Sequence, residues 1–351
     1  MSGRAAFAHN HATGKGILRG GVVDMITDGT RTAEQDVPIA SGGRETVAVL
    51  LSVYNGAPYL REQLISLCAQ SHTDWVVLWR DDGSRDDSRA LMARFAAEVG
   101  PERCREWRSG ARLGVTGSFL TLLRAAEGYP YVAFADQDDV WLPGKLARAI
   151  DWLTGEGARL GLYCARQRLV DHRLSPIGYS PAYPNPPRFP AALAQNIATG
   201  CTVVLNRKAA DRIAESDPPA ASVHDWWSYL VVSALGGRVL FDEEPQVLYR
   251  QHAGNAIGAA PPIWHAAQRA VQRGPLPFFA LMEAHMTALE RSVPGLPETT
   301  IRTLAEIRAG LNGDLLSRCR LVRRGLLRRR TVPENALLLA WMAMKPAARC
   351  E

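Results

Sequence analysis

The chain has 351 residues, of which 47% are apolar and 22% are charged, as in ordinary globular proteins. This composition excludes wholesale disorder. No window holds the roughly 18 consecutive apolar residues that a membrane-spanning helix needs. The N-terminus lacks the charged and then apolar pattern of a signal peptide, so we expect a soluble protein of the cytoplasm.

The formal net charge of +6 is concentrated in one segment. Between Ile301 and Arg330, nine arginines face only Glu306 and Asp314, which gives +7 and leaves the remaining chain near −1. Any role of the basic charge therefore belongs to this segment. The six cysteines form no CxxC pair and no metal-ligand spacing, so we expect free thiols.

The first half of the chain predicts alternating strands and helices. Residues 1–44 show no periodicity, and we expect a flexible leader, with Met25 as an alternative start. After it come, in order, a buried strand, a helix, a second strand, a second helix and a third strand. The strands are expected at 47–53, 75–79 and 131–135, and the helices follow the first two. This order predicts a mostly parallel, doubly wound sheet.

The second half is less regular. Pro176 to Pro190 holds six prolines, which predicts an irregular extended loop. Further elements are expected as a strand at 201–205, a helix from His224 to Ala234, two short strands around Val239 and Val247, and helices from about 261 onward, ending in an apolar segment at 336–344.

Polar side chains lie at the carboxyl end of each of the three predicted parallel strands. These are Ser52 and Tyr54, then Asp81 and Asp82, and then Asp136 and Asp138. Because ligands of such sheets bind at the carboxyl ends of the strands, we expect these groups to converge.

In extended geometry Asp136 and Asp138 would face the same way and could share a Mg²⁺ or Mn²⁺ ion. A solvated acidic turn is the alternative. A nucleotide-binding P-loop needs GxxxxGK[ST] and a dinucleotide site needs GxGxxG, and the chain has neither. A DxDx[TV] phosphatase fits poorly, because Val140 follows Asp138 and Asp139.

Six motifs occur together in a fixed order. They are VLLSVYN at 49–55, DDGSRD at 81–86, FADQDDVW at 134–141, TGC at 199–201, HDWW at 224–227 and LYRQHAGN at 248–255. This set resembles bacterial glycosyltransferase family 2, and most closely the rhamnosyltransferase-type enzymes of surface polysaccharide assembly. The resemblance covers about residues 46–258.

The resemblance implies an α/β GT-A fold with a helical C-terminal extension. We expect a glycosyltransferase domain at 45–258, with a nucleotide-sugar half at 45–145 and an acceptor half at 146–258. The Arg-rich extension then occupies 259–351.

The resemblance also implies roles for donor-binding residues. Ser52 and Tyr54 would contact the base of a dTDP- or UDP-sugar, and Asp82 would accept a hydrogen bond from the imino N–H of that base. Arg112 would lie in the loop that closes over the base. Asp136 would hold the ribose or the outer shell of the metal. A helix-capping turn aspartate is the alternative for Asp82.

The remaining implied roles concern the metal and the reaction. Asp138 would bind Mg²⁺ or Mn²⁺ directly, and His252 is a candidate additional ligand. Asp225 would be the general base, with a helix cap as the alternative.

Contacts to acceptor or diphosphate are expected of His224, Trp226, Trp227 and Arg250. For each of them a structural role is the alternative: a satisfied histidine, a core tryptophan, or an arginine bracing Asp225 or Glu244.

In the basic segment, leucines interleave with arginines from Leu315 to Arg330, which predicts an amphipathic helix attracted to anionic lipid. A helix face packed on the domain is the alternative. Nucleic-acid binding is not expected, because no set of stacking aromatic residues accompanies the arginines.

Together these features predict a metal-dependent inverting enzyme that transfers a sugar such as rhamnose to a lipid-linked or growing surface glycan. It would act at the inner face of the cytoplasmic membrane. The alternatives are a nucleotidyltransferase, which would need a basic Gly-rich loop that the chain lacks, and a catalytically inactive GT-A protein that binds glycan or acts as a scaffold.

Overall fold

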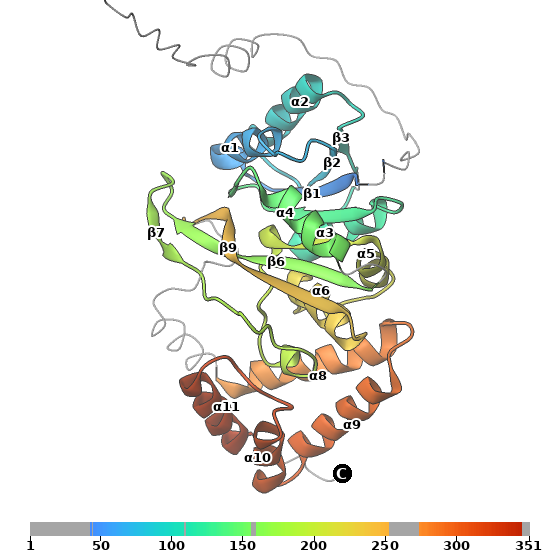
Figure 1. Cartoon of the computed structure of the whole chain (residues 1–351), viewed down its shortest axis with the longest axis vertical. Helices are drawn as coiled ribbons and strands as arrows, with labels where there is room; N and C mark the ends of the chain where they lie inside the picture. The colour runs from blue at the N-terminus through green and yellow to red at the C-terminus, as the bar shows by residue number, and fades with distance from the viewer. Residues whose placement is uncertain (1–42, 44, 109, 156–158, 253–273, 346–351) are drawn as a thin grey trace, which may run out of the picture. The chain divides into compact units, whose positions relative to one another are not determined.

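A computed structural model describes residues 43, 45–108, 110–155, 159–252 and 274–345, all within one compact unit, Ala40–Glu351 (Figure 1). The predicted leader, apart from residue 43, lies outside the described residues. None of the helices in the described ranges is long and apolar enough to cross a membrane.

The first half of the domain is the predicted alternation of strands and helices. Its elements are β1 (Val47–Val53), α1 (Ala57–Cys68), β2 (Trp75–Asp81), α2 (Ser88–Val99), β3 (Cys104–Glu106), α3 (Gly114–Ala125) and β4 (Tyr131–Ala135). Strands β3, β2, β1 and β4 pair in parallel in that order, so their carboxyl ends share one edge.

The second half completes a mixed sheet. Its elements are β5 (Val140–Trp141), α4 (Lys145–Gly155), β6 (Gly161–Val170), β7 (Pro176–Tyr179), β8 (Val204–Asn206), α5 (Arg207–Ala214), α6 (His224–Ala234) and β9 (Arg238–Arg250). Strand β8 pairs antiparallel with β4 and β6, whereas β6 and β9 lie side by side in parallel (Figure 1). Short strands β5 and β7 pair antiparallel with β9 and β6.

Three expectations for this half were wrong in detail. The two short strands around Val239 and Val247 are one strand, β9, which has a register irregularity against β6. The strand expected at 201–205 begins at Val204, because 200–202 form a 3₁₀ turn. The proline-rich loop contains β7 at its start, since its first residues pair with the end of β6.

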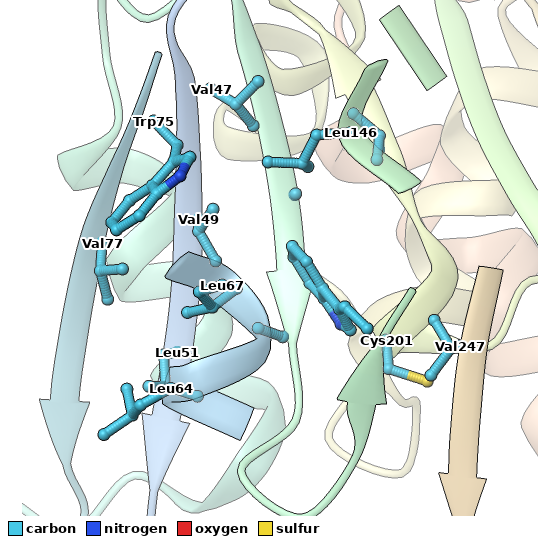
Figure 2. Packing of buried hydrophobic residues seen from close by; sticks show 14 of the residues in the cluster. Val47, Val49, Leu51, Leu64, Leu67, Trp75, Val77, Leu146, Cys201 and Val247 are labelled. Carbon is cyan, nitrogen blue, oxygen red and sulfur yellow. The ribbon is translucent and has the colours of Figure 1, made fainter. Parts of the chain in front are cut away.

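The core lies between the sheet and helices α1, α2 and α4. Val49 and Leu51 of β1 are fully buried and belong to the same cluster as Leu64 and Leu67 of α1 (Figure 2). Leu146 of α4 joins this cluster from farther along the sheet. Burial of such side chains contributes roughly 1.5–3 kcal/mol each, which fixes the ends of the parallel strands relative to one another.

The C-terminal extension is helical, as predicted. Its described helices are α8 (Pro275–Ser292), α9 (Glu298–Asn312), α10 (Leu315–Arg323) and α11 (Val332–Met344). It is joined to the sheet-containing domain by hydrogen bonds: His285 Nε2 lies 2.8 Å from Ser222 Oγ, and Thr300 Oγ1 donates to the Ala234 carbonyl at 2.7 Å.

The basic segment is not one amphipathic helix, and that prediction was wrong. Helix α10 ends at Arg323, and the chain turns at Gly325, whose φ of +71° is left-handed. Leu321 and Leu327 are buried. Arg318 is also buried, and it donates to the carbonyls of Met342 and Lys345.

The apolar side of this segment therefore packs on the extension itself, whereas the alternative expected it to pack on the domain. Arg320, Arg323, Arg324 and Arg328 remain exposed, and so do Leu315 and Leu316 at the start of α10.

Candidate active site

Asp82 lies directly after β2 and is 5% exposed. Its Oδ1 accepts from Arg80 Nη1 at 2.5 Å and from the Leu113 N–H at 2.7 Å, and its Oδ2 accepts from the Gly114 N–H at 2.9 Å. Burial acts to raise the pKa of Asp82, but these hydrogen bonds and the charge of Arg80 outweigh it and lower the pKa. The carboxylate is therefore ionised at neutral pH.

Two exposed side chains lie beside this carboxylate. The guanidinium of Arg112 stands 4.2 Å from the centre of the Tyr54 ring, and its Nε is 3.9 Å from Asp82 Oδ2. Tyr54 follows β1, and half-buried Ser52 is within that strand. The structure thus brings Tyr54, Asp82 and Arg112 together, as the sequence predicts.

The acidic segment Asp136–Asp139 is a turn between β4 and β5, so the expected extended geometry is wrong. Asp136, Asp139 and Cys201 offer ligand atoms that lie within 4.8 Å of one another. Asp138 is outside this group, and its Oδ2 is instead 2.9 Å from His252 Nε2. The charge of Asp138 nevertheless acts on Asp136, so these two carboxyl groups lie close to each other.

Asp139 at the end of the acidic turn and the nearby Lys145 are buried. Burial, the charge of Asp138 and the charge of Asp225 raise the pKa of Asp136 to about 8, and burial also raises the pKa of Asp139. Lys145 Nζ lies 3.3 Å from the centre of the Trp141 ring, and burial lowers the pKa of Lys145 to about 7. This ammonium is a partial counter-charge to the carboxylates.

Arg250 braces the acidic turn. It is 1% exposed and pairs with Glu62, while its Nε donates to the Asp138 carbonyl at 2.8 Å. Its backbone N–H donates to Asp139 Oδ1 at 3.0 Å. The expected contact to diphosphate, or to Asp225 or Glu244, is therefore corrected: this side chain is buried against the turn that carries the aspartates.

Asp225 lies in the first turn of α6, after the N-cap residue Val223, and is 8% exposed. Its Oδ2 accepts from the Gly200 N–H at 2.9 Å, and its Oδ1 accepts from Asn196 Nδ2 at 3.1 Å. Burial raises the pKa of Asp225 to about 6, although these donors act to lower it. Its charge acts on Asp136, so the two carboxyl groups belong to one site.

Two neighbours of Asp225 in the HDWW motif, His224 and Trp227, are structural. His224 stacks on Phe119 at 4.0 Å between ring centres and meets the edge of Phe134 at 4.9 Å. Trp227 is fully buried, and its indole N–H donates to Ser216 Oγ at 2.9 Å. The expected acceptor contacts of His224 and Trp227 are corrected, because both rings pack in the interior.

Trp226 is half-buried, and its indole N–H donates to the Ala192 carbonyl at 2.9 Å. Of the three aromatic residues of the HDWW motif that were expected at the acceptor, it alone keeps an exposed part.

The sequence of this chain is similar to those of known glycosyltransferases. A family model described as glycosyl transferase family 2 matches residues 48–209. The dTDP-rhamnosyl transferase RfbG of Shigella flexneri is 28% identical over 225 residues, which cover 60% of this chain and 74% of RfbG. Residues 48–209 therefore carry a glycosyltransferase family 2 domain.

Further relatives agree with this family. The UDP-Glc:alpha-D-GlcNAc-diphosphoundecaprenol beta-1,3-glucosyltransferase WfgD of Escherichia coli is 28% identical over 107 residues, covering 30% of this chain and 40% of WfgD. The structure of S. aureus TarS residues 1–349 in complex with UDP-GlcNAc matches with a TM-score of 0.52 at 16% identity, over 74% of this chain and 70% of that one. This likeness supports the GT-A fold.

The acidic turn of this glycosyltransferase fits a hard divalent cation. Asp136, Asp138 and Asp139 form a concentration of carboxylates that Lys145 balances only in part, and Asp139 Oδ2 is buried without a hydrogen-bond partner among the described residues. Oxygen ligands suit Mg²⁺ or Mn²⁺. Cys201 suits them poorly, because burial raises the pKa of its thiol and keeps it protonated.

The sequence analysis missed four residues that shape the glycosyltransferase site. Gln137 accepts from the Tyr54 N–H at 2.9 Å and donates to the Tyr54 carbonyl at 3.0 Å, which ties the acidic turn to the end of β1. A Cβ on Gly56 would lie 2.3 Å from Gln137 Oε1, so glycine leaves room for this bridge.

Asn196 and Gly200, which hold Asp225, are the other two. The TGC motif contains Gly200, but the motif does not indicate that its N–H donates to Asp225. A Cβ there would lie 2.7 Å from His224 Nε2, so the contact with α6 requires glycine.

Proposed function

We propose that this glycosyltransferase is metal-dependent and inverting, and that it transfers a sugar such as rhamnose from a dTDP- or UDP-sugar to a lipid-linked or growing surface glycan. The observation that carries the proposal is Asp225, a buried carboxylate with a pKa of about 6 beside the acidic turn. A general base works best when its pKa is near the working pH.

The donor base would bind at Tyr54, Asp82 and Arg112. The ring of Tyr54 offers a stacking face, and Asp82 is held ionised as an acceptor for the imino N–H of uracil or thymine. The relative RfbG, which matches 60% of this chain, is a dTDP-rhamnosyl transferase, and this supports a dTDP-sugar as the donor here.

The carboxylates of Asp136 and Asp138, with His252, would hold the Mg²⁺ or Mn²⁺ ion. Such an ion acts as a Lewis acid that offsets the charge of the departing diphosphate. Arg250 and Gln137 fix the backbone of the acidic turn, so these side chains are positioned before substrate arrives.

In the transfer step, Asp225 accepts the proton of an acceptor hydroxyl while the hydroxyl oxygen attacks the anomeric carbon. The new glycosidic C–O bond forms as the bond to the diphosphate breaks, and the nucleoside diphosphate leaves with the electron pair. Attack from the opposite face inverts the anomeric centre. The hydrogen bonds from Gly200 and Asn196 stabilise the ionised carboxylate that starts this step.

Thermal stabilisation by nucleotide sugars tests the proposal. The purified protein is titrated with dTDP-rhamnose, UDP-glucose, UDP-GlcNAc and GDP-mannose, with Mn²⁺ or EDTA, and Asp138→Ala is measured in parallel. We expect stabilisation by a dTDP- or UDP-sugar that depends on Mn²⁺ and is lost in Asp138→Ala. The matched control is Asp151→Ala, which removes an exposed carboxylate of α4. No stabilisation by any donor would instead favour a catalytically inactive scaffold.

We also propose that the basic segment binds an anionic membrane surface on the cytoplasmic side. Exposed Arg320, Arg323 and Arg328 support this, because basic residues near such a surface contribute about 1 kcal/mol each. Replacing the three by Gln should weaken binding to vesicles that contain phosphatidylglycerol and leave binding to neutral vesicles unchanged. Arg94→Gln in α2 is the control, since that exposed arginine lies outside the basic segment. Unchanged binding of the triple variant would contradict the proposal.

A further inference from the structure

A cavity of about 240 Å³ lies at the ends of β6 and β9. Its lining includes the aromatic side chains Tyr183, Phe241 and Tyr249 and the polar residues Gln167, Asn196 and Thr199. All lining residues lie between Ala165 and Tyr249, so the cavity belongs to the acceptor half. The nucleotide-half residues Tyr54, Asp82 and Arg112 take no part in it.

Two of the lining amides reach the candidate active site. Asn196 Nδ2 donates to Asp225 Oδ1 at 3.1 Å, and Gln167 Nε2 lies 3.6 Å from the Sγ of Cys201. Cys201 is in turn grouped with Asp136 and Asp139. Asn196 therefore connects the cavity to the candidate base Asp225, and Gln167 connects it through Cys201 to the acidic turn.

The chemistry of the lining is neutral. Among the described residues, no Asp, Glu, Lys, Arg or His lines the cavity, whereas aromatic, amide and hydroxyl groups do. Aromatic surface with a few placed hydrogen-bonding groups suits a ligand that is part apolar and part hydroxylated, as a sugar ring is. The volume is below the roughly 300–1,000 Å³ of sites for drug-sized ligands, so the space suits one ring and not a nucleotide.

We propose that this cavity is the subsite for one uncharged sugar ring of the acceptor, and that Tyr183, Phe241 and Tyr249 set its specificity. The proposal rests on the proposed glycosyltransferase function. It adds which residues of the chain recognise the acceptor. A sugar ring bound here would lie near Asp225, because Asn196 contacts both the cavity and that carboxylate. A hydroxyl of the ring could then be deprotonated by Asp225.

The side of the cavity formed by Tyr183 and Phe241 is held in place by contacts within the protein. Tyr183 meets Phe241 edge to face at 5.2 Å, and its hydroxyl is 3.4 Å from the amide nitrogen of Gln195. Gln195 is held by the C-terminal extension: its Oε1 accepts from the Arg330 N–H at 2.8 Å, and its Nε2 donates to Glu334 at 3.3 Å. The extension thus fixes the loop that carries both Tyr183 and Asn196, which reduces the ordering cost of binding.

Filling the cavity from Ala165 tests the proposal. Ala165 lines the cavity and is 4% exposed, so in Ala165→Leu the added carbons occupy ligand space. Transfer from the donor that stabilises the protein is measured with octyl glycosides of rhamnose, glucose, N-acetylglucosamine and glucuronic acid. Hydrolysis of the same donor without acceptor is the second readout.

We expect at least one neutral glycoside to accelerate donor turnover above hydrolysis and the glucuronide to do so least. Ala165→Leu should raise the KM for that glycoside about 10–200-fold, the range for small changes in an apolar pocket, and leave the KM and hydrolysis rate of the donor unchanged. Tyr183→Phe, which keeps the ring, should retain acceptor turnover.

Four results would overturn the proposal: a rise in donor KM, an unchanged glycoside KM, preference for the glucuronide, or no acceleration by any glycoside. If Ala165→Leu does not fold, Tyr183→Ala is measured in its place, with the same outcomes. A wild-type protein that hydrolyses no donor would instead refute the proposed function, and the subsite would fall with it.

Discussion

Asp82 in the nucleotide half and Asp225 in the acceptor half are both buried, with 5% and 8% of the residue exposed. Each is held by two backbone or side-chain donors from other segments. Their pKa values nevertheless move in opposite directions: that of Asp82 is lowered, whereas that of Asp225 is raised to about 6. The exposed fraction of an aspartate alone therefore does not decide its protonation state in this domain.

The difference comes from charge and from the depth of burial, because Asp225 lies deeper in the protein than Asp82 and loses more solvation. Asp82 receives a hydrogen bond from the guanidinium of Arg80, whereas the donors to Asp225 are the neutral groups of Gly200, Asn196 and Trp226. Hydrogen bonds to a charged partner are roughly twice as strong as neutral ones, and they outweigh the cost of burial. One half of the domain thus holds a fixed anion suited to binding, and the other holds a titrating carboxylate suited to proton transfer.

The largest effect is expected from Asp225→Asn. If this carboxylate is the base, the variant should lose about 10²–10⁴-fold in kcat and keep the donor KM, because the amide cannot accept the proton. Steady-state release of the nucleoside diphosphate measures both constants, and thermal unfolding verifies the fold. A full kcat would assign Asp225 to structure alone.

Asp82→Asn should have a smaller effect of the opposite kind. Loss of a charged hydrogen-bond acceptor costs about 1.5–3 kcal/mol, which predicts a donor KM raised roughly 10- to 100-fold. The kcat at saturating donor should stay within a few fold, since Asp82 does not reach the reacting atoms. A kcat loss equal to that of Asp225→Asn would remove the distinction between the two halves.

The parallel part of the site could be predicted from sequence because its geometry is regular. Each of β1, β2 and β4 ends at one edge of the sheet, so Tyr54 and Asp82 are placed by the strands that precede them. Helix α6 was also predicted at its observed bounds, His224–Ala234. The carboxylate of Asp225 was therefore placed correctly at a helix start.

The environment of these side chains could not be predicted in the same way. Asn196 lies 29 residues from Asp225 in an irregular segment, and no periodicity indicates that the two side chains meet. The turn at Asp136–Asp139 likewise replaces the extended geometry on which a shared cation position for Asp136 and Asp138 was predicted. In the HDWW motif, spacing alone does not show that Trp227 is buried while Trp226 is partly exposed.

The pH profile should separate the two aspartates further. A base with a pKa of about 6 is active when ionised, so kcat/KM should be full above that pH and fall tenfold per unit below it. Asn196→Ala removes a donor that lowers this pKa, and the acidic limb should move up by about one unit. A limb that stays in place in Asn196→Ala would mean that another group controls the profile.

The smallest effect is expected at Arg112, at the exposed edge of the nucleotide half. Its side chain is 65% exposed, and its guanidinium lies 4.2 Å from the centre of the Tyr54 ring. A cation–π contact at an exposed site contributes about 0.5–1 kcal/mol, so Arg112→Gln should raise the donor KM about two- to fivefold. Arg108→Gln is the matched control, because that exposed arginine pairs with Glu106 away from Tyr54. Asp82 keeps its hydrogen bond from Arg80 in both variants. If Arg112→Gln raised the donor KM as much as Asp82→Asn does, the loop that carries Arg112, and not the Asp82 carboxylate, would hold the donor base.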